Sequence, residues 1–80
     1  MKHLRIEDIN NISNAIELMK FIDCLRNDYR MNCVSWENET IDDYLGAINA
    51  WLKDSHELSG QPVVVLQLIA KILYIGKIYE

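Results

Sequence analysis

The chain has 80 residues, of which half are hydrophobic, and it contains a single proline and only three glycines. This composition excludes a disordered chain and a loop-rich disulfide scaffold, and the length is that of one small domain. The net charge of −4, without clustered Lys or Arg, argues against nucleic acid as a direct ligand. We therefore expect one domain over residues 1–80, built from regular secondary structure.

Cysteine usage and the N-terminal sequence indicate where the protein resides. Cys24 and Cys33 match no common zinc or redox motif, and no second pair completes a metal site, so we expect both to be reduced thiols. Charged residues recur before any hydrophobic run begins, which is unlike a signal peptide. These features predict a cytoplasmic protein.

The first helix is predicted to begin after Asn14. Asn14 is a suitable N-cap, and Glu17, three residues later, is its capping-box partner. The segment His3–Asn11 alternates weakly and is compatible with a short strand, an extended arm or a helical turn. Apolar residues then recur at helical spacing along one face of the helix: Ala15, Leu18, Ile22, Leu25 and Tyr29.

The second helix is predicted to begin at Thr40, whose hydroxyl can accept a hydrogen bond from the backbone N–H of Asp43. Asp42 and Asp43 then occupy the first turn, where the helix dipole favours negative charge. A continuous apolar stripe follows, and the helix should end near Asp54 to Ser55. The stripe consists of Ile41, Tyr44, Leu45, Ile48, Trp51 and Leu52.

The third helix is predicted to follow a turn at Ser59-Gly60, with Pro62 at its first position, and to run to the end of the chain. The valines at 63–65 would suit a buried strand, but the apolar pattern continues well beyond strand length. A membrane span is also disfavoured, since Gln67, Lys71 and Lys77 interrupt the segment. An almost entirely apolar helix is typical of a domain core or an oligomer interface.

These elements predict an all-α fold, a small antiparallel bundle of about three main helices with a short N-terminal arm. Short connections and one broad apolar face on each helix favour this architecture. The expected core contains Leu18, Ile22, Leu25, Leu45, Ile48, Trp51, Leu66, Ile69 and Leu73.

The segment before the second helix carries a distinctive motif. It consists of Trp36-Glu37-Asn38-Glu39-Thr40, then Asp43-Tyr44-Leu45, Ala47, Ala50-Trp51 and the closing Ile78-Tyr79-Glu80. This motif resembles an uncharacterised family of small bacterial proteins known only as a domain of unknown function. The resemblance extends from about Phe21 and includes Asp28-Tyr29. Gly46 and the β-branched stretch from Pro62 to Leu66 depart from the family pattern. The resemblance implies no assigned activity and transfers no catalytic residue.

The motif also has a structural interpretation. Asn38 and Thr40 can satisfy free backbone donors at the helix start, and Trp36 can pack under the turn as a hydrophobic staple. Glu37 or Glu39 can interact with the positive end of the helix dipole.

The charge distribution is compatible with a solvated face and with a partner-binding surface. Acidic and basic residues balance in residues 1–30, whereas residues 36–57 carry six carboxylates against Lys53 alone. Such a surface is suited to a basic protein, particularly a nuclease whose cleft attracts phosphate, although it can also simply aid solubility. The predicted partner-binding residues are Trp36, Glu37, Glu39, Asp42, Asp43, Asp54 and Glu57.

No constellation indicates catalysis. His3 and His56 have no neighbouring nucleophile, and adjacent carboxylates such as Asp42 and Asp43 point in different directions on a helix. We therefore expect no enzyme, no cofactor and no metal site. The leading hypothesis is an immunity protein or antitoxin that occludes a basic toxin domain. The alternative is a homo-oligomeric structural or regulatory protein that dimerises through residues 62–79.

Overall fold

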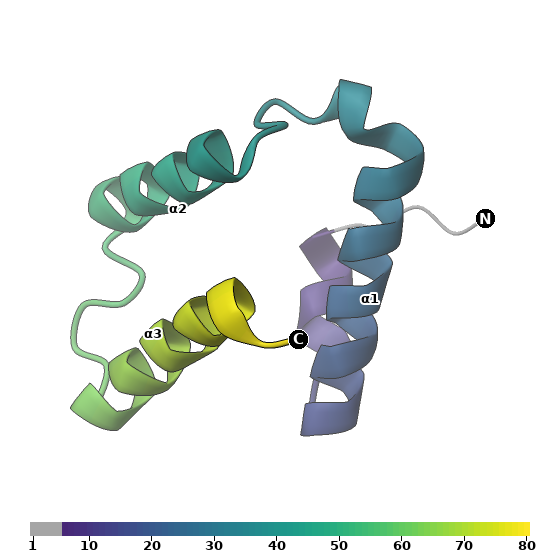
Figure 1. Cartoon of the computed structure of the whole chain (residues 1–80). Coiled ribbons are helices and arrows are strands. Elements are labelled where there is room, and N and C mark those ends of the chain that lie inside the picture. Colours follow the sequence, from purple (N-terminus) through teal and green to yellow (C-terminus); the bar gives the residue numbers. More distant parts are fainter. Residues whose placement is uncertain (1–5) are drawn as a thin grey trace. The chain divides into compact units, whose positions relative to one another are not determined.

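The computed structural model describes residues 6–80, and every regular element in that range is helical (Figure 1). A short 3-10 helix, η1 (Ile6–Asn11), precedes α1 (Ala15–Asn32), and a second 3-10 turn, η2 (Cys33–Ser35), follows it. The remaining elements are α2 (Ile41–Ser55) and α3 (Val63–Ile78). The predicted all-helical fold with three main helices and a short N-terminal piece is confirmed. Residues 1–5 of the predicted arm lie outside the described residues.

The chain divides into two compact units, Met1–Tyr44 and Leu45–Glu80. The first unit contains η1, α1, η2 and the first residues of α2. The second contains the rest of α2 and all of α3, between which the chain reverses direction (Figure 1). The expectation of one domain over residues 1–80 stays a prediction.

Capping side chains determine where α1 begins. Asn14 has an extended backbone, and its Oδ1 accepts a hydrogen bond from the backbone N–H of Glu17 at 2.8 Å, as predicted. The Glu17 carboxylate reaches one residue further back than in a capping box, because it accepts from the backbone N–H and the hydroxyl of Ser13 at 3.1 and 2.6 Å. Three hydrogen bonds therefore close this helix end.

Thr40 starts α2 in the predicted way. Its hydroxyl oxygen accepts from the Asp43 N–H at 3.0 Å, and its carbonyl accepts from the Tyr44 N–H at 2.9 Å. The helix ends at Ser55, as expected, and His56 follows with a φ of 57°, a left-handed conformation that stops the helix. Gly60 has a φ of 82°, which explains the need for glycine in the predicted turn.

Both ends of α3 differ slightly from the prediction. Pro62 is the N-cap, one residue before the helix, and its carbonyl accepts from Val65 and Leu66 at 3.0 and 3.3 Å. The helix ends at Ile78 and does not continue to the chain terminus, because Tyr79 is extended. The valines at 63–65 are helical, which confirms that the length of the apolar pattern outweighs local β propensity.

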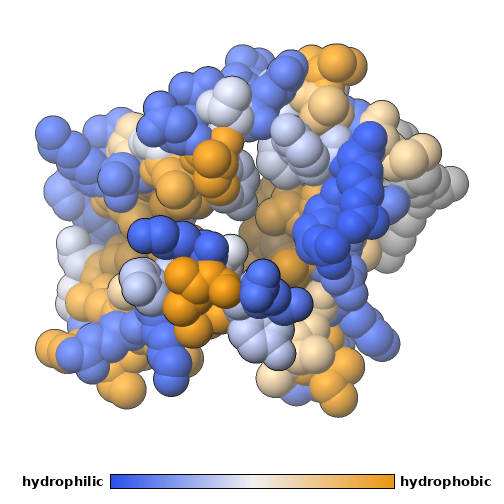
Figure 2. Space-filling model, viewed as in Figure 1, coloured by the Kyte–Doolittle hydropathy of each residue, from blue (hydrophilic) through white to orange (hydrophobic). Residues whose placement is uncertain are grey.

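The main difference from the sequence prediction is the absence of a buried core in the described residues. No residue in the range 6–80 is buried, and the predicted core residues Leu18, Ile22 and Leu45 are about two-fifths exposed. Trp51 is 55% exposed, so the large penalty of emptying a buried tryptophan site does not apply to it. Figure 2 shows hydrophobic residues in orange on the surface in view. Apolar periodicity identified the helical faces correctly but overestimated how completely each unit covers them by itself.

The α1 cap gives a pH-dependent prediction. The pKa of Glu17 is lowered, first by the hydrogen bond from the Ser13 hydroxyl and then by that from the Ser13 N–H. Desolvation opposes this shift, and the charge of Lys20 adds a smaller lowering effect. A lowered folded-state pKa stabilises the protein above the ordinary glutamate pKa of about 4.3, and this stabilisation is lost as the pH falls through the folded value. Glu17→Gln should therefore lower the free energy of unfolding near neutral pH, and the difference from the parent should shrink on acidification.

The matched control is Glu7→Gln, which alters an exposed carboxylate in η1. Urea unfolding across the acidic range measures both variants. A Glu17→Gln effect that does not change with pH would contradict the role assigned to this carboxylate.

Candidate functional site

Three aromatic side chains, Tyr29, Trp36 and Tyr44, form a cluster in the first unit, here called the aromatic cluster. Tyr29 meets Trp36 edge to face, with ring centroids 5.2 Å apart and an interplanar angle of 75°. Trp36 stacks on Tyr44 at 6.1 Å and 24°. These are the offset geometries that aromatic quadrupoles favour, and they join the C-terminal half of α1 to the start of α2.

Two polar anchors hold the aromatic cluster in place. The indole Nε1 of Trp36 donates to Asp28 Oδ2 at 2.7 Å, while Asn32 Nδ2 donates to Asp28 Oδ1 at 3.2 Å, so both carboxylate oxygens are occupied. The Tyr29 hydroxyl donates to the carbonyl of Glu39 at 2.9 Å. Because the Asp28 bonds are charge-assisted and partly buried, they fix the position of Trp36 more strongly than the stacking contacts alone would.

The turn after α1 brings Trp36 back toward the helix. The Ser35 hydroxyl donates to the carbonyl of Asn32 at 2.8 Å, and the Trp36 N–H donates to the carbonyl of Cys33 at 3.0 Å. These bonds satisfy carbonyls that the end of α1 leaves free. The chain reverses over η2, and Trp36 then lies beside the helix face that carries Asp28 and Tyr29.

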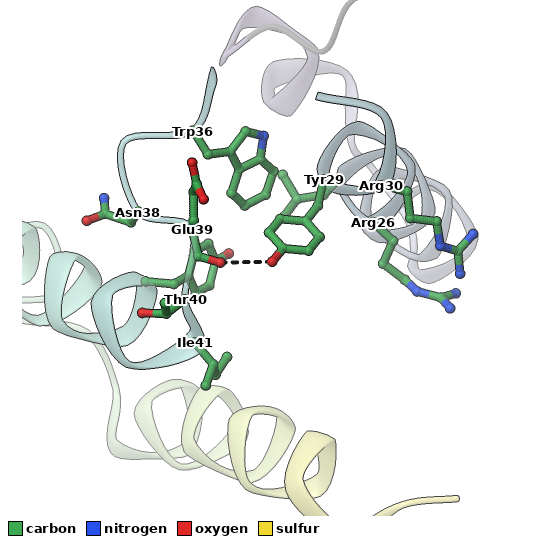
Figure 3. Close-up of a pocket in the computed structure, with 10 residues that line it drawn as sticks. Arg26, Tyr29, Arg30, Trp36, Asn38, Glu39, Thr40 and Ile41 are labelled. Atoms are coloured by element: carbon green, nitrogen blue, oxygen red, sulfur yellow. Dashed lines mark hydrogen bonds between the residues drawn. The ribbon is translucent and has the colours of Figure 1, made fainter. Parts of the chain in front are cut away.

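Next to the aromatic cluster is a hollow of ≈ 590 Å³, here called the aromatic hollow (Figure 3). Aromatic and aliphatic side chains from α1 form one wall, and the loop before α2 with the first turn of that helix forms the other. Figure 3 shows the guanidinium groups of Arg26 and Arg30 directed away from Trp36. The hollow is lined by Leu25, Arg26, Tyr29, Arg30, Trp36, Asn38, Glu39, Thr40, Ile41 and Tyr44.

Charges beside the aromatic hollow are unevenly neutralised. Arg26 pairs with Asp23 at 3.3 Å, and this is the one salt bridge found among residues 6–80. Arg30 forms no ion pair within that range. The exposed carboxylates of the loop and of the first turn of α2 form no ion pair in this range either. These carboxylates are here called the acidic segment, which consists of Glu37, Glu39, Asp42 and Asp43. Of the acidic segment only Glu39 lines the hollow, where it lies with Arg26 and Arg30.

The predicted partner-binding residues are divided between the two units. Trp36 is half-buried and serves as the structural anchor, while the acidic segment is exposed in the first unit. Asp54 and Glu57 are exposed in the second unit, at the end of α2 and in the turn that follows it. A single surface that includes both groups stays a prediction.

Sequence reasoning did not identify Asp28, Arg26 and Arg30 as neighbours of the motif. Asp28 and Arg30 belong to α1, and only the turn over η2 brings the motif back to them. The available signals were the Asp28-Tyr29 pair and the one-turn spacing between Arg26 and Arg30. Neither signal distinguishes a solvated helix face from the wall of a hollow.

Three further observations concern the described part of the chain. Within residues 6–80, no three His, Cys, Asp or Glu side chains gather into a group that could hold a metal ion. No helix in that range is long and apolar enough to cross a membrane. Cys24 and Cys33 are both free thiols.

The hydrogen bond between Trp36 and Asp28 gives a stability prediction. Trp36→Phe keeps an aromatic ring but removes the indole donor, so it should lower the free energy of unfolding by about 1–2 kcal/mol, within the range for bonds to charged groups after allowance for partial exposure. Trp51→Phe is the matched control, because the Trp51 side chain forms no hydrogen bond or ring contact among residues 6–80. This substitution should cost less than about 0.5 kcal/mol. Chemical denaturation that gives equal losses for the two variants would refute the anchoring role.

Comparison with known proteins identifies the family of the chain. Neither a curated protein nor a solved structure shows significant similarity to it. A family model described as a family of unknown function, DUF7660, matches residues 14–80, which include α1, the Trp36 motif, α2 and α3. The earlier resemblance is thereby confirmed over a longer range than its motif covers. The protein belongs to the DUF7660 family.

Proposed function

We propose that this protein is a non-catalytic binding module, an immunity protein or antitoxin that neutralises a basic toxin domain with nuclease activity. The observation that carries the proposal is the acidic segment, whose four exposed carboxylates have no ion pair among residues 6–80. Carboxylates that are not neutralised within the chain remain available to a partner of opposite charge.

The physical requirements of neutralisation support this reading. A nuclease cleft must attract phosphate and is therefore basic, so an acidic surface accelerates association with it and selects against acidic proteins. A neutraliser acts by occlusion and needs no chemistry of its own. In this proposal Trp36, Glu37, Glu39, Asp42 and Asp43 form the principal contact. Asp54 and Glu57 carry further exposed negative charge in the second unit.

Charge reversal tests the proposal. The first partner to examine is the protein encoded by the neighbouring reading frame, with binding and protection of cells as the two readouts. Asp42→Lys combined with Asp43→Lys should slow association and weaken binding, and the difference from the parent should shrink at high salt because screening removes the steering. The melting temperature should change little, apart from the loss of favourable charges at the α2 N-terminus, which is worth about 1 kcal/mol.

The control is Glu7→Lys combined with Glu80→Lys. It changes the net charge by the same amount at exposed positions outside the predicted surface. If the control weakens binding as much as the double aspartate variant, net charge alone explains the effect and the acidic segment is not the contact. A double aspartate variant that protects cells as well as the parent would overturn the proposal.

A second candidate is a homo-oligomeric structural or regulatory protein, and the exposure of α3 favours it. Every residue of this helix except Val65 is exposed, including Val64, Leu68 and Ile72 at 68%, 56% and 50%. Exposed apolar surface of this extent is common at interfaces between protein chains. In this reading a second copy covers residues 62–79.

Sedimentation analysis tests the second candidate. If α3 forms a symmetric interface, the mass should exceed the 9.4 kDa of one chain at micromolar concentrations. Leu68→Lys combined with Ile72→Lys should then return the protein to a monomer that remains helical by circular dichroism. Ile6→Lys combined with Ile16→Lys is the control at exposed isoleucines outside α3. A parent protein that is monomeric throughout would remove this candidate.

A further inference from the structure

We infer that the aromatic hollow receives residues Ile78-Tyr79-Glu80 of a second copy of this chain, here called the closing segment. In this arrangement the ring of Tyr79 lies against the aromatic wall, and the Glu80 carboxylate lies beside Arg26 and Arg30. The inference goes beyond the toxin-binding proposal and rests on the second candidate, the homo-oligomer. It adds to that candidate a contact outside α3 and names the site that accepts it.

The closing segment presents an aromatic ring and a carboxylate that are free within the described part of the chain. α3 ends at Ile78, and Tyr79 is extended, with its backbone N–H donating to the carbonyl of Ile75 at 2.9 Å. The Tyr79 side chain is 84% exposed and packs on no other ring among residues 6–80. Glu80 is also exposed and forms no ion pair in that range. Both groups are therefore available to another molecule.

The aromatic hollow has room for a short stretch of chain. Its volume of ≈ 590 Å³ lies within the range of about 300–1,000 Å³ typical of pockets that hold ligands of many atoms. One side chain alone would leave most of this space filled with water. An incoming tyrosine ring and its aliphatic neighbour find apolar surface there, on which a ring can pack edge to face or offset. This surface consists of Leu25, Tyr29, Trp36, Ile41 and Tyr44.

The aromatic wall is in place before a second copy arrives. Trp36 is held by its bond to Asp28 and by the flanking rings of Tyr29 and Tyr44. The Tyr29 hydroxyl donates to the carbonyl of Glu39, which Figure 3 shows as a dashed line across the site. Because the indole and this hydroxyl already have acceptors, a ring can cover them without leaving a donor unpaired. Binding to such a preformed site loses little conformational entropy in the receptor.

The charge of the hollow is opposite in sign to that of the whole protein. The chain has a net charge of −4, whereas Arg26 and Arg30 line the hollow against Glu39 alone. Arg30 forms no ion pair among residues 6–80, and Arg26 pairs only with Asp23, in an exposed contact that contributes little. Both guanidinium groups are therefore available to an incoming carboxylate, which the closing segment supplies.

The rings and the guanidinium groups occupy separate parts of this site. Figure 3 shows Arg26 and Arg30 directed away from Trp36. Successive side chains of an extended segment point in different directions, so Tyr79 and Glu80 can reach the two parts together. In a symmetric dimer each copy gives its closing segment and receives that of the other, so the contact occurs twice.

Fluorescence of the whole protein tests the aromatic part of the contact. In the background variant Trp51→Phe, Trp36 is the sole tryptophan, and its emission should change on dilution in step with the mass measured by sedimentation. Tyr79→Ala should weaken dimerisation about tenfold, in line with the loss of one large buried side chain. The matched control Tyr79→Phe keeps the ring and should dimerise as the parent does. Both variants should remain helical, because Tyr79 is exposed and lies beyond α3.

An exchange of charges shows that the closing segment comes from a second copy. Arg30→Glu and Glu80→Arg each place like charges at the contact, so each variant alone should dimerise several-fold more weakly than the parent. In a mixed dimer of the two variants, one contact joins the two altered residues and the other joins the two unaltered ones. Both contacts are then matched, and mixing should restore the affinity. Recovery also shows that both variants are folded.

The matched control replaces Glu80→Arg by Glu7→Arg, an exposed carboxylate in η1. Its mixed dimer with Arg30→Glu retains one contact between like charges. A labelled Arg30→Glu copy should therefore bind Glu80→Arg several-fold more tightly than it binds Glu7→Arg.

The outcomes separate this inference from the proposed functions. If Tyr79→Ala dimerises as well as the parent, or if the two mixed dimers are equally stable, the inference is overturned and an interface through α3 still stands. A parent that is monomeric throughout would overturn both the inference and the second candidate, whatever occupies the hollow in that monomer. Failure of the neighbouring protein to bind would refute the toxin-binding proposal without changing any of these measurements.

Discussion

The hydrogen bond from the Trp36 indole to Asp28 is the interaction on which the candidate site depends. It joins residues eight positions apart across the turn over η2, and a second donor, Asn32, occupies the other carboxylate oxygen. With both oxygens satisfied, the partial burial of Asp28 carries little desolvation penalty. Once Trp36 is held in this way, Tyr29 and Tyr44 can pack on its edge and face, and the aromatic hollow forms beside them.

Within each unit, local interactions account for much of the observed hydrogen bonding. No residue in the described range is buried, while α1 and α2 each begin with a well-formed side-chain cap. Short-range bonds of this kind stabilise individual helices, but they cannot supply the stability that a hydrophobic core gives to a small domain. A partner that covers exposed apolar surface would therefore stabilise the protein as it binds. Both the toxin-binding proposal and the homo-oligomer alternative make use of this property.

The aromatic hollow and the acidic segment suit different parts of an association reaction. Exposed charges act over a distance and raise the rate of encounter, whereas a desolvated apolar contact slows dissociation. Both lie in the first unit, around the junction between α1 and α2. In the proposed function, a partner that engages the acidic segment would be selected by its charge.

Local chemistry in the sequence determined the helices. Asn14 and Thr40 cap α1 and α2 because their side-chain oxygens reach donors three residues ahead, and this geometry depends on neighbouring residues alone. The length of the apolar run identified the third helix despite its valines, and the concentration of carboxylates in residues 37–43 was evident from composition.

Tertiary structure decided which residues surround Trp36 and how much apolar surface remains exposed. The pairing with Asp28 depends on the path of the turn through η2, which periodicity does not specify, so Arg26 and Arg30 became part of the site only when the chain folded back. The exposure of Trp51 could not be predicted for a similar reason. Apolar spacing shows which face of a helix avoids water, but burial depends on whether another element, or another molecule, covers that face.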